Sequence, residues 1–196
     1  MKHPSYFIAP DRLILVLLAA MSLYVTGCAT TVPAPDTTCV QFEEHSKDRD
    51  YSTKYVYSDT DSTAAMKNFR PLPRGQRVFV RLYNMYLAPS KINPCSYLTI
   101  HKDVYIQRSA KAAPALEEIR EFYTDGGTLI ATKSESVGNQ LRTTGYYTGD
   151  TSLPIPPKAP PGKYRIVSML VMKSKNRHNV TVLARTSASF AIMSRR

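Results

Sequence analysis

Two cysteines and two histidines share a spacing that could hold a metal ion. His45 lies six residues after Cys39, and His101 lies six residues after Cys95. Two thiolates and two imidazoles could complete a tetrahedral zinc site, although the paired ligands of structural zinc sites usually lie closer together. In an oxidising compartment the cysteines would instead form a disulfide, worth roughly 4 kcal/mol for so long a loop. We expect the disulfide, with two buried free thiols and a zinc site as the alternatives.

Three glutamates form the densest acidic cluster in the second half of the chain, namely Glu117, Glu118 and Glu121. A hydrolase that uses paired carboxylates holds them across a cleft, whereas adjacent residues of a strand point to opposite faces. We therefore interpret the cluster as a solvated edge. The sequence contains no G-x-S-x-G, H-E-x-x-H or P-loop motif, and its later histidines lie in separate segments. We predict no catalytic, cofactor-binding or metal-binding residue, and a protein that is not an enzyme.

Positive charge dominates the chain, which has a formal net charge of +11. Residues 71–196 contain nineteen basic and seven acidic side chains, and a basic surface attracts anionic partners. Lys173, Lys175 and Arg177 form the densest cluster and are a possible anion-binding site. Most other basic residues are dispersed, which is typical of a solvated surface. Because no nucleic-acid recognition motif is present, we predict no nucleic-acid partner.

The first 27 residues divide into a charged part and an apolar part. Lys2 and Arg12 precede an apolar stretch, Leu13–Tyr24, whose length is typical of a signal peptide. At about 1.5 Å per residue this stretch would reach about 18 Å, well short of a membrane core of about 30 Å. We therefore expect a removable export signal at residues 1–27.

The sequence Val25-Thr26-Gly27-Cys28 resembles the lipobox of bacterial lipoproteins, in which an apolar residue and two small residues precede a cysteine. The resemblance implies cleavage after Gly27, a diacylglyceryl thioether on Cys28, and acylation of the new amino terminus by a fatty acid such as palmitate. Several acyl chains together give stable membrane attachment. Ala29, rather than Asp, follows the cysteine, which in a Gram-negative cell implies the outer membrane, facing the periplasm.

The mature chain divides by composition into three parts. Residues 28–38 are rich in Pro, Thr and Ala and are typical of a flexible tether. Residues 39–73 are polar and acidic, and we expect them to pack on the domain, with one strand at 51–57 and a turn at 59–62. Residues 74–196 form the basic domain.

Apolar alternation and turn residues predict a strand-rich domain. In the first strand we place Val78, Val80 and Leu82 on one face. Lys102 interrupts an apolar face, so a turn at 101–103 is an alternative to a continuous strand there. We prefer a strand to a helix at 114–123, because Asp125-Gly126-Gly127 can return the chain as a hairpin. The predicted strands after residue 73 are 77–87, 97–107, 114–123, 128–133, 163–173 and 180–193.

About seven strands separated by frequent turns indicate an all-β fold, a single β-sandwich. The run SLPIPPKAPPGKYRI, residues 152–166, resembles the approach to a late strand in immunoglobulin-like and transthyretin-like bacterial domains. In the last strand we expect Val180 and Val182 on the same face as Phe190.

The functional expectation follows from the anchor and from the lack of catalytic motifs. We expect a non-enzymatic accessory or assembly component of an envelope protein complex, and a secretion machine is one such complex. Thr181–Met193 would be the edge strand with which a partner pairs. The alternative is a binding module for an anionic envelope polymer, either lipopolysaccharide or cell-wall glycan. Tyrosines could stack on sugars, but we interpret them as packing residues; the candidates are Tyr51, Tyr55, Tyr57, Tyr146 and Tyr147.

Overall fold

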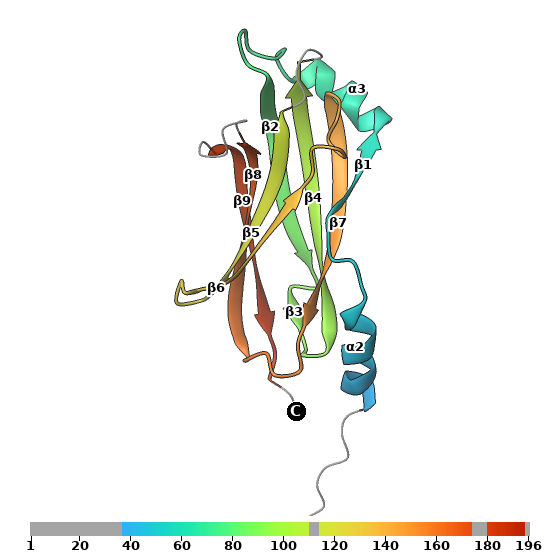
Figure 1. Cartoon of the computed structure of the whole chain (residues 1–196), viewed down its shortest axis with the longest axis vertical. Coiled ribbons are helices and arrows are strands. Elements are labelled where there is room, and N and C mark those ends of the chain that lie inside the picture. The colour runs from blue at the N-terminus through green and yellow to red at the C-terminus, as the bar shows by residue number, and fades with distance from the viewer. Residues whose placement is uncertain (1–36, 110–113, 174–179, 195–196) are drawn as a thin grey trace, which may run out of the picture. The chain divides into compact units, whose positions relative to one another are not determined.

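The computed structural model describes residues 37–109, 114–173 and 180–194, which contain nine β-strands and two α-helices. The strands form two sheets, so the expected all-β sandwich is confirmed (Figure 1). Sheet A has the order β1 (Lys54–Ser58), β7 (Gly145–Ile155), β4 (Ser96–Arg108), β2 (Val78–Ala88). Sheet B has the order β3 (Lys91–Ile92), β9 (Val180–Ile192), β8 (Gly162–Lys173), β5 (Ala115–Thr124), β6 (Leu129–Ser136). Neighbouring strands pair antiparallel, except β3 with β9.

The predicted strands after residue 73 are confirmed as β2, β4, β5, β6, β8 and β9. The segment 114–123 is a strand rather than a helix, and it pairs with β6 through the expected hairpin. Gly127 has a φ of 81°, a value that few other residues adopt, and its N–H donates to the carbonyl of Thr124. Lys102 lies within β4, which continues through 101–103 without a turn.

Strand β7 was not predicted, and with the two-residue β3 it raises the count from about seven to nine. Gly145 and Gly149 resemble turn residues in the sequence. In the structure Gly149 is paired with Tyr55 of β1, and Gly145 lies beside the ring of Tyr57. The two tyrosine rings occupy the space that side chains at the glycines would need. A central strand therefore carries glycines because a neighbouring strand packs its tyrosines over them.

Two irregularities in pairing change which residues face the core. The register of β2 shifts between Val80 and Leu82, so Tyr83 is buried although it was predicted on the opposite face from Val80. A shift between β8 and β9 leaves Leu183 without a Cα partner and packed against the core. Consequently Val180 and Val182 are exposed, although they were predicted on the same face as Phe190, which is buried.

Helix α3 (Asp59–Asn68) replaces the turn predicted at 59–62. Ser58 caps it by accepting a hydrogen bond from the Asp61 N–H, and Asp59 and Asp61 place negative charge in its first turn. Helix α2 (Thr37–Lys47) begins inside the segment that was predicted as tether. Within the described ranges, neither helix has the length and apolar character needed to cross a membrane.

The interior contains two apolar clusters with polar residues between them. One cluster includes Val104 and Leu170, and the other includes Ile100 and Ile166. On β4 the residue between the two clusters is Lys102, and on β8 it is Ser168. Both are buried. The middle of the sandwich is therefore polar, although each end is apolar.

Candidate functional site

The two mature cysteines form a disulfide. Cys39 of α2 is bonded to Cys95, with 5.2 Å between their Cα atoms, which confirms the expected bridge. His45 Nδ1 lies 2.7 Å from the carbonyl oxygen of Gln41, and His101 Nδ1 lies 2.6 Å from Asp150 Oδ1. Among the described residues, no group of His, Cys, Asp and Glu side chains is arranged to hold a metal ion. The zinc alternative is therefore wrong for these cysteines.

The other predicted site residues are only partly within the described ranges. Cys28, Lys175 and Arg177 lie outside them. Lys173 ends β8, and its Nζ is 2.6 Å from Glu117 Oε1 on the neighbouring strand β5. Lys173 is thus already engaged by a carboxylate, which weakens its attraction for an external anion.

The polar middle of the sandwich is built around Lys102 and Glu118. Lys102 projects from β4 of sheet A and Glu118 from β5 of sheet B, and Lys102 Nζ is ion-paired with Glu118 Oε1. Both side chains have 0% exposure, so the predicted solvated edge is wrong for Glu118. Burial lowers the pKa of Lys102 well below its usual value, and the nearby Arg120 adds to the lowering.

Hydroxyl groups satisfy the rest of the Glu118 carboxylate. Tyr55 donates to Oε2 over 2.7 Å, and Ser168 donates to Oε1 over 3.1 Å. The Tyr83 hydroxyl lies 2.7 Å from Ser168 Oγ and extends the network to β2. Burial raises the pKa of Tyr83 to about 12 and that of Tyr55 well above its usual value. These tyrosines therefore act as neutral hydrogen-bond donors at physiological pH.

A second ion pair continues the network towards one side of the sandwich. Arg120 Nη2 is 2.8 Å from Glu135 Oε1 on β6, and Arg120 also donates to the carbonyl of Tyr51. Thr53 donates to Glu135 from both its N–H and its hydroxyl. From sheet A, Thr151 donates to the carbonyl of Tyr51 and Lys102 donates to the hydroxyl of Thr53, so residues 51–53 are bonded to both sheets. The network links the two sheets, and Lys102, Glu118 and Arg120 are buried within it.

The sequence analysis did not predict this network, because its charged residues interrupt the apolar pattern of their strands. Lys102 broke an apolar face, and Glu118 was one of a row of glutamates. The sequence does contain a signal for this network. A lysine and a glutamate, which carry opposite charges, each occupy an inward position of a strand, and the two strands belong to different sheets. Buried charges are normally paired, so one should have been matched with the other.

The outer face of sheet A presents an aromatic and polar surface. The exposed Tyr86 stacks on His101 with 4.7 Å between ring centres, and His101 Nδ1 is 2.6 Å from Asp150 Oδ1. The pKa of Tyr146 is raised to about 12, mainly by burial and to a smaller extent by the negative charge of the nearby Asp103. Among the tyrosines considered for sugar stacking, Tyr55 and Tyr147 are buried in the core and Tyr57 is partly exposed.

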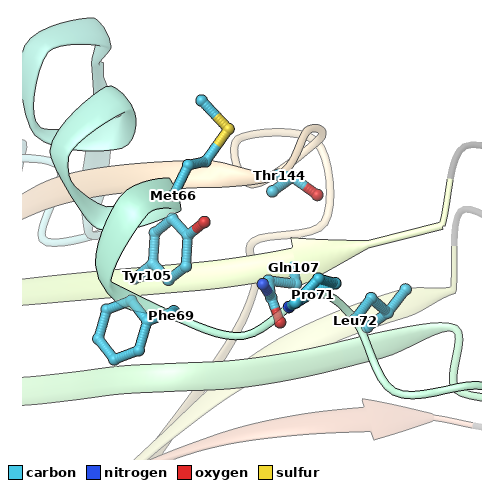
Figure 2. A pocket seen from close by; sticks show the side chains of 7 residues that line it. All are labelled: Met66, Phe69, Pro71, Leu72, Tyr105, Gln107 and Thr144. Carbon is cyan, nitrogen blue, oxygen red and sulfur yellow. The ribbon is translucent and has the colours of Figure 1, made fainter.

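A pocket of about 340 Å³ lies where α3 and the chain after it cover sheet A. Figure 2 shows Met66 and Phe69 beside Tyr105, with Pro71 and Leu72 further along the same segment. Phe69 stacks on Tyr105 with 5.0 Å between ring centres. Within the described part of the chain, the buried Tyr105 hydroxyl has no hydrogen-bond partner. The walls are mainly apolar, so this pocket offers little for catalysis.

The edges of sheet B are open to different degrees. β9, the predicted edge, pairs with β3 only at Ala191 and Ile192, and β2 of sheet A lies close beside it. β6 pairs with β5 on one side, and among the described residues no strand pairs with its other side. Leu129 and Ile130 at the start of β6 are about half exposed, at 49% and 54%. β6 is therefore the more accessible edge.

Comparison with known proteins gives similarity in structure alone. No model of a known protein family matches the sequence, and a comparison with curated protein sequences gives no match. The C-terminal domain of wzt is 13% identical, with 65% of this chain and 84% of that chain covered and a TM-score of 0.46. The CARDB domain of PF1109 from Pyrococcus furiosus, solved with di-metal ions, is 14% identical, with 59% and 92% covered and a TM-score of 0.31. At these values the similarities carry no information on function, and the two-sheet fold is established by the strand pairing.

Proposed function

We propose that this chain is the precursor of an outer-membrane lipoprotein whose sandwich domain binds another envelope protein and performs no catalysis. The lipobox-like sequence ending at Cys28 supports the anchor, and Ala29 after it supports the outer membrane. A disulfide between Cys39 and Cys95 suits the oxidising periplasm. In this proposal the domain is an accessory or assembly component of an envelope complex.

The single observation that carries the binding role is the open edge of β6. An edge strand exposes backbone N–H and C=O groups that another chain can pair with, and proteins usually protect such edges with charges, prolines or bulges. The first four residues of β6, Leu129 to Thr132, contain neither a charge nor a proline, and all four are exposed. A partner strand added there would gain main-chain hydrogen bonds and contact with Leu129 and Ile130.

The direction of the backbone groups identifies the best position for a test. The Val137 N–H donates to the carbonyl of Leu116 on β5. Because successive N–H groups of a strand point to opposite sides, the N–H groups of Lys133 and Ala131 also face β5, and that of Thr132 faces outwards. Proline at 132 would remove one outward donor while leaving the β5–β6 hydrogen bonds intact.

The test compares Thr132→Pro with Thr132→Val, which keeps the N–H group. Each full-length protein is purified from detergent-solubilised membranes of the cells that produce it, and copurifying proteins are identified by mass spectrometry. We expect wild type and Thr132→Val to retain the same envelope protein at high salt, and Thr132→Pro to lose it while keeping its thermal unfolding midpoint. Equal retention by both variants would exclude strand addition at β6.

The anchor is tested in parallel with Cys28→Ser, and Cys39→Ser serves as the matched cysteine control. We expect Cys28→Ser to lose labelling by fatty acid and to keep residues 1–27, while Cys39→Ser is labelled and cleaved like the wild type. Fatty-acid labelling of Cys28→Ser would contradict lipid anchoring at this residue. If lipopolysaccharide or wall fragments copurify in place of a protein and are removed by salt, the anionic-polymer module becomes the better description.

A further inference from the structure

The Lys102–Glu118 pair places an amine against a carboxyl group in a site closed to water. The two side chains come from strands in different sheets, contact each other, and have 0% exposure. Two other lysine–glutamate pairs among the described residues are more exposed: Lys173 with Glu117 at 39% and 21%, and Lys133 with Glu135 at 38% and 10%. Isolation from water is therefore what distinguishes the interior pair.

Burial favours the neutral forms of both partners. Moving charges out of water is unfavourable, so transfer of one proton from the ammonium to the carboxylate gives an amine and a carboxylic acid. Burial and Arg120 both lower the pKa of Lys102, in the direction of a free amine. A neutral lysine has a nitrogen lone pair and is a nucleophile.

Three groups are placed to stabilise negative charge on the carboxyl oxygens. The Tyr55 hydroxyl is 2.7 Å from Oε2 of Glu118 and the Ser168 hydroxyl is 3.1 Å from Oε1. Arg120 Nε is 3.6 Å from Oε1. Hydrogen-bond donors and positive charge around an attacked carboxyl group stabilise the oxyanion of a tetrahedral intermediate.

We propose that Lys102 and Glu118 condense into an amide that covalently joins the two sheets. Nζ of the neutral amine attacks the carboxyl carbon of the neutral acid, forming the N–C bond, and one C–O bond then breaks. The leaving oxygen departs as water, carrying the acid proton and one amine proton, so no oxidant, reductant or co-reactant is required. Exclusion of water from the site then slows hydrolysis of the amide.

The test is peptide mapping of the full-length protein isolated from membranes, after reduction of the disulfide and digestion with trypsin. An amide at Lys102 blocks cleavage there, so residues 92–108 remain one peptide. We expect that peptide joined to residues 112–120, with a mass below the sum of the two by one water molecule. Fragmentation should place the link on Lys102 and Glu118, rather than on the adjacent Glu117.

The controls separate this reaction from accidental cross-linking. Lys102→Met removes the nucleophile while keeping a long apolar side chain, and it should give residues 112–120 as a linear peptide. Ser168→Ala removes one oxyanion donor and should lower the joined fraction in freshly synthesised protein. Lys173, whose partner Glu117 is partly solvent-exposed, should be cut normally by trypsin in every variant and carry no link. If wild-type protein is cut after Lys102 and gives only linear peptides, the proposal is wrong.

Discussion

Four side chains converge on the two carboxylate oxygens of Glu118: Lys102, Arg120, Tyr55 and Ser168. A buried charge pair is not in itself a large gain, because desolvation opposes the attraction between the charges. Removal of one partner is much more costly, because the other charge remains buried without compensation. The network therefore makes the residues depend on one another more than it adds to the total stability.

This dependence predicts a non-additive result for two substitutions. Glu118→Leu leaves Lys102 buried and unpaired, and should lower the free energy of unfolding by about 3–5 kcal/mol. Adding Lys102→Met removes that charge and should restore most of the loss. Urea unfolding of Glu118→Leu, Lys102→Met and the double variant tests this expectation. Because none of the three variants can form the proposed amide, comparison among them is independent of it. A double variant as unstable as Glu118→Leu would contradict the argument.

The buried Tyr83 predicts a loss of stability at alkaline pH. Its pKa is raised to about 12 in the folded protein, from 10.0 for an ordinary tyrosine. Below pH 10 both states keep the proton, so the contribution is constant. Between pH 10 and about 12 the unfolded chain loses the proton while the folded protein holds it, so stability falls as pH rises, by about 3 kcal/mol in total.

The measurement is the free energy of unfolding in urea across that pH range, for wild type and Tyr83→Phe. The phenylalanine variant loses the hydrogen bond to Ser168 at every pH, so its baseline is lower. Its pH dependence should nevertheless be flatter than that of wild type, since one ionising group is absent. Parallel curves for the two proteins would show that Tyr83 ionises alike in the folded and unfolded states.

At the scale of elements, β1 packs on β7 at two glycines, Gly145 and Gly149. The tyrosine beside one of them is free to move, and the tyrosine beside the other is not. A Cβ at Gly149 would lie 2.5 Å from the ring of Tyr55, which is buried and held by its hydrogen bond to Glu118. A Cβ at Gly145 would meet the ring of Tyr57, which is 44% exposed and can turn aside.

Gly149→Ala should therefore destabilise the protein by about 1–3 kcal/mol, the usual cost of overpacking a core. Gly145→Ala is the matched control and should cost less, since the partly exposed Tyr57 can move. Urea midpoints compare the two variants. A larger loss at Gly145 would mean that Ser62, the other close neighbour at that position, is the less tolerant contact.

Most strands could be predicted from the sequence, because apolar residues alternate along them and turn residues separate them. β7 could not, because its glycines are explained only by tyrosines on another strand. Nor could the shifts near Val80 and Leu183, since a bulge depends on how two strands pair rather than on either strand alone. The same limit applied to the site: Lys102 and Glu118 have meaning only as a pair brought together by two sheets.

At the scale of the whole molecule, several kinds of contact hold the two sheets together. The apolar clusters at each end supply most of the buried surface, and the polar network joins the sheets between them. At one side Gln140 imitates a neighbouring strand: its side chain accepts from the Tyr55 N–H and donates to the carbonyl of Thr53. Helix α2 is attached to the sandwich by the disulfide between Cys39 and Cys95, the residue before β4.

That disulfide should be essential for α2 and dispensable for the sandwich. An isolated helix of 11 residues is marginal in water, and α2 has few other anchors: Phe42 packs on Tyr97 at 4.7 Å, and Arg49 lies over the same ring. Substituting serine at both cysteines frees a loop with a sequence separation of 56 and should lower the free energy of unfolding by about 4 kcal/mol.

Hydrogen exchange distinguishes loss of the helix from general weakening of the protein. In the double serine variant, amides of residues 37–47 should exchange rapidly under native conditions, while those of β4 remain protected. Oxidised and reduced wild-type protein should show the same contrast, which controls for the substitutions themselves. Protection of α2 that survives reduction would mean that Phe42 and Arg49 hold the helix without the covalent bond. The disulfide would then stabilise the domain chiefly by restricting its unfolded state.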